Sequence, residues 1–415
     1  MTRAQRLPSY GLFAAMLAAA GLPIYIHAPK FYVDEYGLSL TALASVLFVL
    51  RLVDVVQDPL LGWLSEKTRS VRGAMVSFAV IILALSMWGL FAVVPPIPAL
   101  WWFALTLGGL FSSFSFLTIS FYAQGVAKAD AMGAGHVRLA TWRETGGLLG
   151  VCIAAITPTV LMGFMGRPFV GFALGFAVLC LAGWASMRKE WSAGKAENEA
   201  ATPVGFAVVL KDPIARRLLT VALVNATPVA VSSTLFLFFV ESRLDALGWE
   251  GPLLLLFFLS AAISAPLWGF MAQRVSPKTT LLAGMVLAVV TFAGALLLGS
   301  GDVALFAVVC IASGAALGAD MTLLPALFAR RLSKIAPNAG QAFGVWSFVT
   351  KFTLAFAAVA LLPLLEQSGF VAGQIAQPDQ ALWVLSYLYA GVPCVLKLIA
   401  IFLLWRTNLT EDDAK

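Results

Sequence analysis

Long apolar stretches alternate with short polar connections along almost the whole chain. Each stretch holds about 20 residues or more, enough for a helix rising 1.5 Å per residue to cross roughly 30 Å of hydrocarbon. We therefore predict twelve transmembrane helices, which cover residues 9–33, 38–64, 73–94, 98–126, 139–164, 167–187, 215–240, 250–273, 279–300, 302–329, 341–366 and 381–405.

Composition supports a membrane protein of the all-α class. Of the 415 residues, 60% are hydrophobic and only 12% are charged, whereas a soluble domain has roughly 25% charged residues. Four cysteines all fall inside apolar runs and are predicted to be buried small side chains without disulfides or metal: Cys152, Cys180, Cys310 and Cys394.

The basic residues predict the orientation in the membrane. They concentrate at the two termini and in the even-numbered connections, and only Arg167 and Arg243 lie in odd-numbered ones. By the positive-inside rule we expect both termini to be cytoplasmic in a plasma (inner) membrane protein. This distribution accounts for the net charge of +6, so we expect no nucleic-acid partner.

Two related halves are predicted. A polar stretch at residues 188–205 separates six predicted helices from six others, which suggests an N-terminal bundle (1–190), a cytoplasmic linker (191–208) and a C-terminal bundle (209–415). DPLLGWLSEK at 58–67 aligns with APLWGFMAQR at 265–274, an offset of 207 residues. Parallel six-helix repeats are typical of the major facilitator fold, which binds substrate near the midplane between its two halves.

The second predicted helix carries three charged residues, Arg51, Asp54 and Asp58, within an otherwise apolar run. On experimental insertion scales, each such residue at the centre of a membrane helix costs roughly 2.5–3.5 kcal/mol of insertion free energy. In the second copy, Ala261 and Ala265 occupy the positions of the two aspartates. Because only one half bears the charges, we predict a specialised site there.

Asp54 and Asp58 are four residues apart and share one helix face, with Arg51 one turn earlier. Together they leave a net charge of −1, which one Na⁺, Li⁺ or H⁺ would neutralise, and carboxylates suit hard cations. The alternative is a purely structural ion-pair cluster, in which Lys351 supplies a further partner.

Three stretches resemble the glycoside–pentoside–hexuronide:cation symporter family, which includes melibiose permease. They are RLVDVVQDPLLGWLSEKTRS (51–70), TWRETGGLLG (141–150) and FGVWSFVTKFTLAFAA (343–358). The resemblance implies that a cation, Na⁺ or H⁺, drives uptake of a small polar solute. It also implies a cation site at Asp54, Gln57, Asp58 and Ser115, with charge-coupling roles for Arg51, Arg143 and Lys351.

The chain departs from melibiose permease at several of these positions. Gln57 stands where asparagine is found, which leaves both Na⁺ and H⁺ open. Ala18 and Thr118 replace the two aspartates that hold the galactoside, and Tyr122 replaces a tryptophan. Losing the strongest hydroxyl acceptors while keeping Lys30, Arg143 and Lys351 favours an anionic or zwitterionic solute, such as a sugar acid, over a galactoside.

Polar residues inside the predicted helices are expected to line the transport path. His27 is either a satisfied interior histidine or a proton carrier, and Lys30 either extends to the outer interface or contacts substrate. Asp320 is expected to pair with Lys351 or Lys397. The predicted substrate pocket comprises Ala18, Tyr25, His27, Thr118, Tyr122, Trp346 and Ser347.

The end of the second predicted helix resembles the loop between helices two and three of the major facilitator superfamily. The matching residues are Gly62, Glu66, Lys67 and Arg69. We expect this segment to act as a latch on the cytoplasmic side.

The leading hypothesis is thus a cation-coupled symporter of a sugar or sugar acid that works by alternating access. Two alternatives stay open: a symporter of a lipid-like solute such as a lysophospholipid, and a sensor or assembly factor on the same fold. No phosphate-binding loop of the G-x-x-x-x-G-K-[ST] type occurs in the chain. We expect no enzymatic activity, no cofactor beyond the coupling ion, no partner other than substrate and lipid, and function as a monomer.

Overall fold

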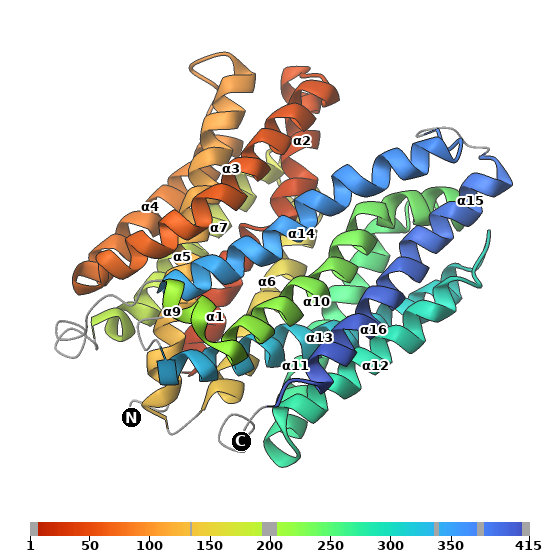
Figure 1. Ribbon diagram of the computed structural model, residues 1–415. Coiled ribbons are helices and arrows are strands. Elements are labelled where there is room, and N and C mark those ends of the chain that lie inside the picture. Colours follow the sequence, from red (N-terminus) through yellow and green to blue (C-terminus); the bar gives the residue numbers. More distant parts are fainter. Residues whose placement is uncertain (1–6, 133–134, 193–205, 336–339, 372–376, 409–415) are drawn as a thin grey trace. The chain divides into compact units, whose positions relative to one another are not determined.

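The computed structural model describes residues 7–132, 135–192, 206–335, 340–371 and 377–408, and these form helices with no strand among them (Figure 1). The principal helices are α1 (Leu7–Ala19), α2 (Leu22–Tyr36), α3 (Leu40–Lys67), α4 (Arg72–Phe91), α5 (Ala99–Asp130), α6 (His136–Met162), α7 (Pro168–Ser192), α10 (Pro213–Phe238), α11 (Glu250–Arg274), α12 (Pro277–Ala295), α13 (Val303–Ile335), α14 (Gly340–Gln367), α15 (Asp379–Ser386) and α16 (Val392–Trp405). A short helix, α9 (Phe206–Lys211), precedes α10.

Nine helical segments in the described part of the chain are long and apolar enough to cross a membrane. They run over Arg69–Phe91, Ala99–Asp130, His136–Met162, Pro168–Trp191, Pro213–Arg243, Glu250–Arg274, Pro277–Ala295, Val303–Ile335 and Asp379–Trp405. The predicted second and eleventh helices correspond to α3 and α14, which have 28 residues each. At 1.5 Å per residue, both also reach the length of a spanning helix.

The predicted first helix is broken into two pieces. α1 ends at Ala19, and α2 begins at Leu22 with Pro23 in its first turn, where a missing backbone N–H does no harm. The break lies at Gly21, whose ψ of −117° interrupts the helix, whereas Pro29 is accommodated inside α2. The side chains of Tyr25 and Lys30 lie outside the described residues.

Two predicted membrane helices contain a wider, π-helical turn. One follows α10 at Phe239–Arg243, and the other, Tyr387–Gly391, joins α15 to α16. Pro393 stands at the start of α16. Because proline has no N–H to donate, the preceding turn loses a regular bond, a common setting for such a turn.

The chain divides into two compact units. The first comprises Met1–Val208 together with Leu332–Phe348, and the second comprises Val209–Arg331 together with Val349–Lys415. Sequence reasoning places residues 332–348 in the second bundle, but the contacts of this segment, which includes the first turns of α14, lie in the first unit.

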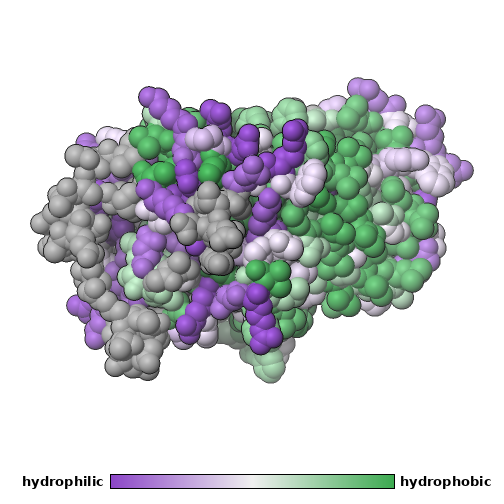
Figure 2. All heavy atoms as spheres, turned by 60° about the horizontal axis from the view of Figure 1, so that its bottom comes forward, coloured by the Kyte–Doolittle hydropathy of each residue, from purple (hydrophilic) through white to green (hydrophobic). Residues whose placement is uncertain are grey.

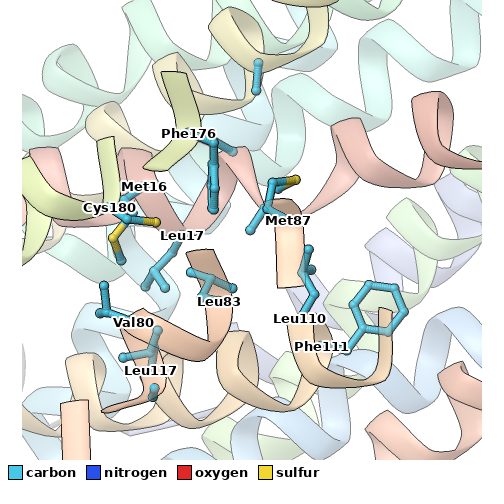
Figure 3. Packing of buried hydrophobic residues seen from close by; sticks show 14 of the residues in the cluster. Met16, Leu17, Val80, Leu83, Met87, Leu110, Phe111, Leu117, Phe176 and Cys180 are labelled. Atoms are coloured by element: carbon cyan, nitrogen blue, oxygen red, sulfur yellow. The ribbon is translucent and has the colours of Figure 1, made fainter. Parts of the chain in front are cut away.

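The first unit has a core of buried apolar side chains from α1, α4, α5 and α7 (Figure 3). Met16 and Leu17 of α1, Leu83 of α4 and Leu117 of α5 belong to it and are at most 5% exposed. A second contact joins α1 to α6, where a Cβ added to Gly146 would lie 2.1 Å from the Gly11 carbonyl oxygen. Glycine therefore permits the two backbones to touch, as small residues do in membrane helix pairs.

The second unit has a core of its own. In it the rings of Phe239 and Tyr389 stack with centroids 4.2 Å apart, and Phe306 packs against both. Many large apolar side chains nevertheless stay exposed, such as Leu297 (86%) and Val290 (65%). Exposed apolar surface of this kind suits contact with lipid, and Figure 2 shows hydrophobic residues covering a broad area beside a region where hydrophilic residues gather.

An ion pair closes the start of α10. The Asp212 carboxylate accepts hydrogen bonds from Arg331 Nε (3.1 Å) and Nη2 (2.6 Å) and caps the helix through the Ala215 N–H (2.7 Å). Burial raises the pKa of the Asp212 carboxyl, but these hydrogen bonds and the charge of Arg331 outweigh it, so the pKa is lowered from its ordinary value.

Candidate functional site

The charged stretch lies in the middle of α3. The Ser39 side chain caps this helix by accepting a hydrogen bond from the Ala42 N–H (3.2 Å), and the helix then continues through Pro59 to Lys67. α3 packs along α5 within the first unit. Besides apolar contacts, Ser65 Oγ and Ser120 Oγ join the two helices by a hydrogen bond of 2.7 Å.

Asp54 is the centre of a polar cluster between α3 and α5. Its Oδ1 accepts hydrogen bonds from Ser115 Oγ (2.8 Å) and from Gln57 Nε2 (3.0 Å). Gln57 Oε1 in turn accepts from Ser112 Oγ (2.9 Å). Three of the four residues predicted for the cation site are thus brought together, with Asp54 6% and Ser115 1% exposed.

Asp58, the fourth predicted cation residue, lies one helical turn after Asp54 and is completely buried. Arg51, one turn before Asp54, is half-buried. The hydrogen bonds of the cluster join Ser115 and Gln57 to Asp54. With the Asp58 carboxylate one turn along the same helix, these groups supply oxygen atoms of the type that binds a hard cation.

Ser112 was not predicted as part of the cation site. Its neighbour in the cluster, Ser115, is three residues further along α5, so both lie on one face of that helix. This spacing was visible in the sequence and would have included Ser112, had the rotation of α5 about its axis been known.

The equivalent place in the second unit is filled differently. Ala261 and Ala265 of α11, at the positions of the two aspartates, are fully buried. A Cβ added to Gly318 of α13 would lie 2.8 Å from the Ala261 carbonyl oxygen, so the two helices meet backbone to backbone. In the second unit, close backbone packing thus takes the place of the polar cluster. The buried carboxylate pair of α3 has no counterpart on α11.

A second polar cluster joins α5 to α6. Glu144 Oε1 accepts hydrogen bonds from Arg143 Nε (2.6 Å) and the Tyr122 hydroxyl (3.0 Å). The Arg143 guanidinium lies 3.7 Å from the centre of the Tyr122 ring. The ring of Phe343 on α14 also packs against Tyr122, with 5.2 Å between the ring centroids. Arg143 and Tyr122, predicted for separate roles, are therefore direct neighbours, and Glu144 was missed as their common partner.

This cluster keeps unused hydrogen-bonding capacity. Arg143 Nη2 is buried and has no hydrogen-bond partner among the described residues, and the same is true of the Thr118 hydroxyl. Thr118 lies one turn before Tyr122 on α5. A buried donor without a partner is costly, which points to a polar ligand at this place.

Other predicted pocket residues are less informative. His27 Nε2 is 2.9 Å from the Ala155 carbonyl oxygen of α6, and this contact places the proton on Nε2, as in a satisfied interior histidine. Ala18 is half-buried near the end of α1. Trp346, Ser347 and Lys351 are half-buried residues of α14.

The predicted latch contacts the start of α14. A Cβ added to Gly62 would lie 2.9 Å from the Gly340 carbonyl oxygen, and Glu66 Oε2 accepts a hydrogen bond from the Gln341 N–H (3.3 Å). A carboxylate at a helix N-terminus is favourable because it faces unpaired N–H groups. Lys67 lies over the Trp63 ring at 4.6 Å, and Arg69 begins the 3-10 turn that follows.

A buried ion pair lies in the second unit. Lys397 of α16 is paired with Asp320 of α13 and donates a hydrogen bond to Asn225 Oδ1 of α10 (2.6 Å). All three side chains are at most 8% exposed. Of the two partners predicted for Asp320, the structure therefore selects Lys397.

Comparisons with known proteins agree with this architecture. A sequence profile of the family described as MFS/sugar transport protein matches residues 8–411. The crystal structure of a bacterial homologue of the iron transporter ferroportin, in its outward-facing state, superposes with a TM-score of 0.74 at 16% identity and covers 98% of this chain and 99% of that chain. A structure of a bacterial ferroportin homologue with soaked iron gives a TM-score of 0.72, with the same identity and coverage. A search of curated proteins finds no match.

Proposed function

We propose that this chain, which belongs to the MFS/sugar transport protein family, moves a sugar or sugar acid across the membrane together with a cation. The family and the fold establish an integral membrane protein that is a secondary transporter of the major facilitator type and not an enzyme. The coupling ion, the direction of symport and the solute are the proposed part.

The buried Asp54 cluster carries the proposal for coupling. Two carboxylates, at most 6% exposed, lie in one bundle of a transporter while the equivalent helix of the other bundle has alanines. Charged groups inside a membrane protein are expensive and usually functional. A cation that binds Asp54 and Asp58 would remove the excess negative charge, and Ser115 and Gln57 would complete its oxygen ligands.

Both Na⁺ and H⁺ suit this arrangement. For Na⁺, the Ser115 oxygen and the Gln57 amide oxygen would join the carboxylates as neutral ligands. For H⁺, protonation of one of the two carboxylates would be sufficient, because it removes one negative charge from the buried site. Gln57 donates to Asp54 through Nε2 at 3.0 Å. Binding of Na⁺ would require its amide oxygen to face the ion, whereas binding of H⁺ would not, so the orientation of this amide distinguishes the two kinds of coupling.

The Arg143 cluster supports an anionic solute. Its guanidinium already pairs with Glu144 through Nε, while Nη2 is buried without a partner among the described residues. A carboxylate or hydroxyl of a sugar acid would satisfy this donor and the hydroxyl of Thr118, and the Tyr122 ring would pack on the sugar. Ala18 and Thr118 add no carboxylate, and the carboxylate of Glu144 is already paired with Arg143.

Transport would then follow alternating access, in which the two halves expose the solute first to one side and then to the other. We assign the Gly62–Arg69 segment to a cytoplasmic latch, with Glu66 binding the start of α14. Cytoplasmic termini, a plasma (inner) membrane location and function as a monomer belong to the same proposal, as does membership of the melibiose permease-like subfamily. The same proposal includes an N-terminal bundle at 1–190, a cytoplasmic linker at 191–208 and a C-terminal bundle at 209–415.

The test is a thermal-shift screen of purified protein against neutral sugars, sugar acids and lysophospholipids. Each compound is added with Na⁺ and with K⁺ instead, at two pH values. We expect a sugar or sugar acid to raise the unfolding temperature more when Na⁺ is present or when the pH is lowered. A response only to lysophospholipid would replace the sugar substrate, and the absence of any cation-dependent response would refute coupling.

A further inference from the structure

The second unit contains a basic cavity whose lining includes none of the groups invoked for transport. It has a volume of about 850 Å³ and lies where the start of α10 and the end of α16 come together. Nine described residues line it and none of these is acidic; the polar ones include Arg217, Thr220, Arg406 and Asn408.

The two arginines in this cavity have no ion-pair partner in the part of the chain that the structure describes. Arg217 lies one turn into α10, and Arg406 directly follows α16. Two exposed guanidiniums that line one cavity create a positive potential there, which an anion would reduce. Guanidinium is also the side-chain group that best matches a phosphate, because its N–H groups bind two oxygens at once.

Lys278 fixes one wall of the cavity. Its ammonium group donates to the carbonyl oxygens of Trp405 (2.9 Å), the last residue of α16, and of Thr407 (2.8 Å), just beyond the helix. The backbone that carries Arg406 is thereby held in place. Arg406 also packs over the Phe402 ring, 5.5 Å from its centre.

A bilayer spanned by α10 and α16 would place this cavity at the level of the lipid headgroups, because helix ends lie at the membrane surface. It lies at the ends of two membrane helices, on the side where the basic connections concentrate. Trp405 and Phe402, which are 66% and 49% exposed, line it, and aromatic side chains of this kind are enriched at the membrane interface. Basic pockets between membrane helices on the cytoplasmic side are a setting in which anionic headgroups bind.

We propose that Arg217 and Arg406 bind the phosphate of an anionic phospholipid whose acyl chains lie along α10 and α16 beside Trp405. The recognised chemistry is a phosphate with two accessible oxygens, which free phosphate ion shares. The acyl chains are what commit the site to a lipid, because Val221 and Leu403 line the same cavity with apolar surface.

The experiment measures the unfolding temperature of the full chain in neutral detergent. Short-chain phosphatidylglycerol, short-chain phosphatidylcholine and inorganic phosphate are titrated separately. We expect a saturable rise with phosphatidylglycerol that exceeds the rise with either of the others at equal concentration. Arg217→Gln and Arg406→Gln should each weaken the apparent affinity by about tenfold or more, since each removes charged hydrogen bonds.

Arg216→Gln is the matched control. Arg216 is the exposed neighbour of Arg217, does not line the cavity and carries the same charge, so this variant should bind the lipid like the unaltered chain. Equal losses in the Arg216 and Arg217 variants would reduce the effect to general charge and refute the site. An equal response to inorganic phosphate would refute the lipid. The acidic residues 411–413 are neutralised in a further variant. If this lowers the unfolding temperature, and Arg217→Gln and Arg216→Gln made in that background then bind the lipid equally, the ligand of Arg217 is the chain's own terminus and the proposal fails.

Discussion

Replacing Ser115 by alanine tests the Asp54 cluster at a single hydrogen bond. The Ser115 hydroxyl donates to Asp54 Oδ1 over 2.8 Å, and both side chains are almost fully buried, at 1% and 6% exposure. A hydrogen bond to a charged group contributes about 1.5–3 kcal/mol. At about 1.4 kcal/mol for each factor of ten, loss of this oxygen from the site should weaken apparent Na⁺ affinity by about 10- to 100-fold.

The assay is a titration of Na⁺ at constant pH against the unfolding temperature of purified protein. Ser113→Ala serves as the control, because Ser113 is also buried on α5 but donates only to carbonyls of its own helix, Gly109 (2.7 Å) and Leu110 (3.1 Å). We expect the Ser113 variant to retain the affinity of the unaltered chain. Equal cation affinity in the Ser115 variant and the unaltered chain would refute the assignment of Ser115 to the cation site.

Three further predictions concern stability. Gly146→Leu should lower the unfolding temperature, since its Cβ would lie 2.1 Å from a backbone oxygen of α1 and overpacking costs about 1–3 kcal/mol or more. Asp212→Asn should remove acid sensitivity: the lowered pKa of Asp212 means that its pairing with Arg331 stabilises the fold above the ordinary carboxyl pKa and is lost as pH falls through the lowered one. Lys397→Met alone should destabilise by about 3–5 kcal/mol, because it leaves Asp320 buried without its cation, and adding Asp320→Leu should restore much of the loss.

Each of these has a control in the chain. Gly175→Ala on α7 meets nothing within 4 Å of the added Cβ and should be neutral, so equal losses at both glycines would contradict the close α1–α6 contact. Unfolding temperatures at pH 7 and at about pH 2 should differ less for the Asp212 variant than for the unaltered chain, because the pairing is lost only below the ordinary carboxyl pKa. If the double variant at Lys397 and Asp320 is no more stable than the single one, the ion pair does not account for the loss.

The pattern of apolar residues was sufficient to predict most of the helices, because a membrane helix must be long and apolar. It also placed Arg51, Asp54 and Asp58 in the middle of one of them, α3. The break at Gly21 was not predicted. The apolar pattern predicted one continuous helix over 9–33, yet the helix breaks just before Pro23 and continues through Pro29. Proline is harmless in a first turn, so its position relative to a helix start decides its effect.

The pairing of side chains between helices lies beyond the sequence pattern. Asp54 and Gln57 were found from the charges and the family resemblance, but the contact of Gln57 with Ser112 depends on how α3 and α5 rotate about their axes. The partner of Asp320 depends likewise on which helix faces α13. Ala261 already shows in the sequence that the second copy lacks the charge. Only the structure shows what takes its place, which is a close backbone contact between Ala261 and Gly318.

The most direct test of the central claim is solute accumulation in proteoliposomes driven by an imposed Na⁺ or H⁺ gradient. The account predicts that Asp58→Asn, at a completely buried carboxylate, abolishes gradient-driven accumulation, while Glu35→Gln, at an exposed carboxylate of α2, accumulates solute like the unaltered chain. Accumulation by the Asp58 variant at the level of the unaltered chain, under the same gradient, would contradict it.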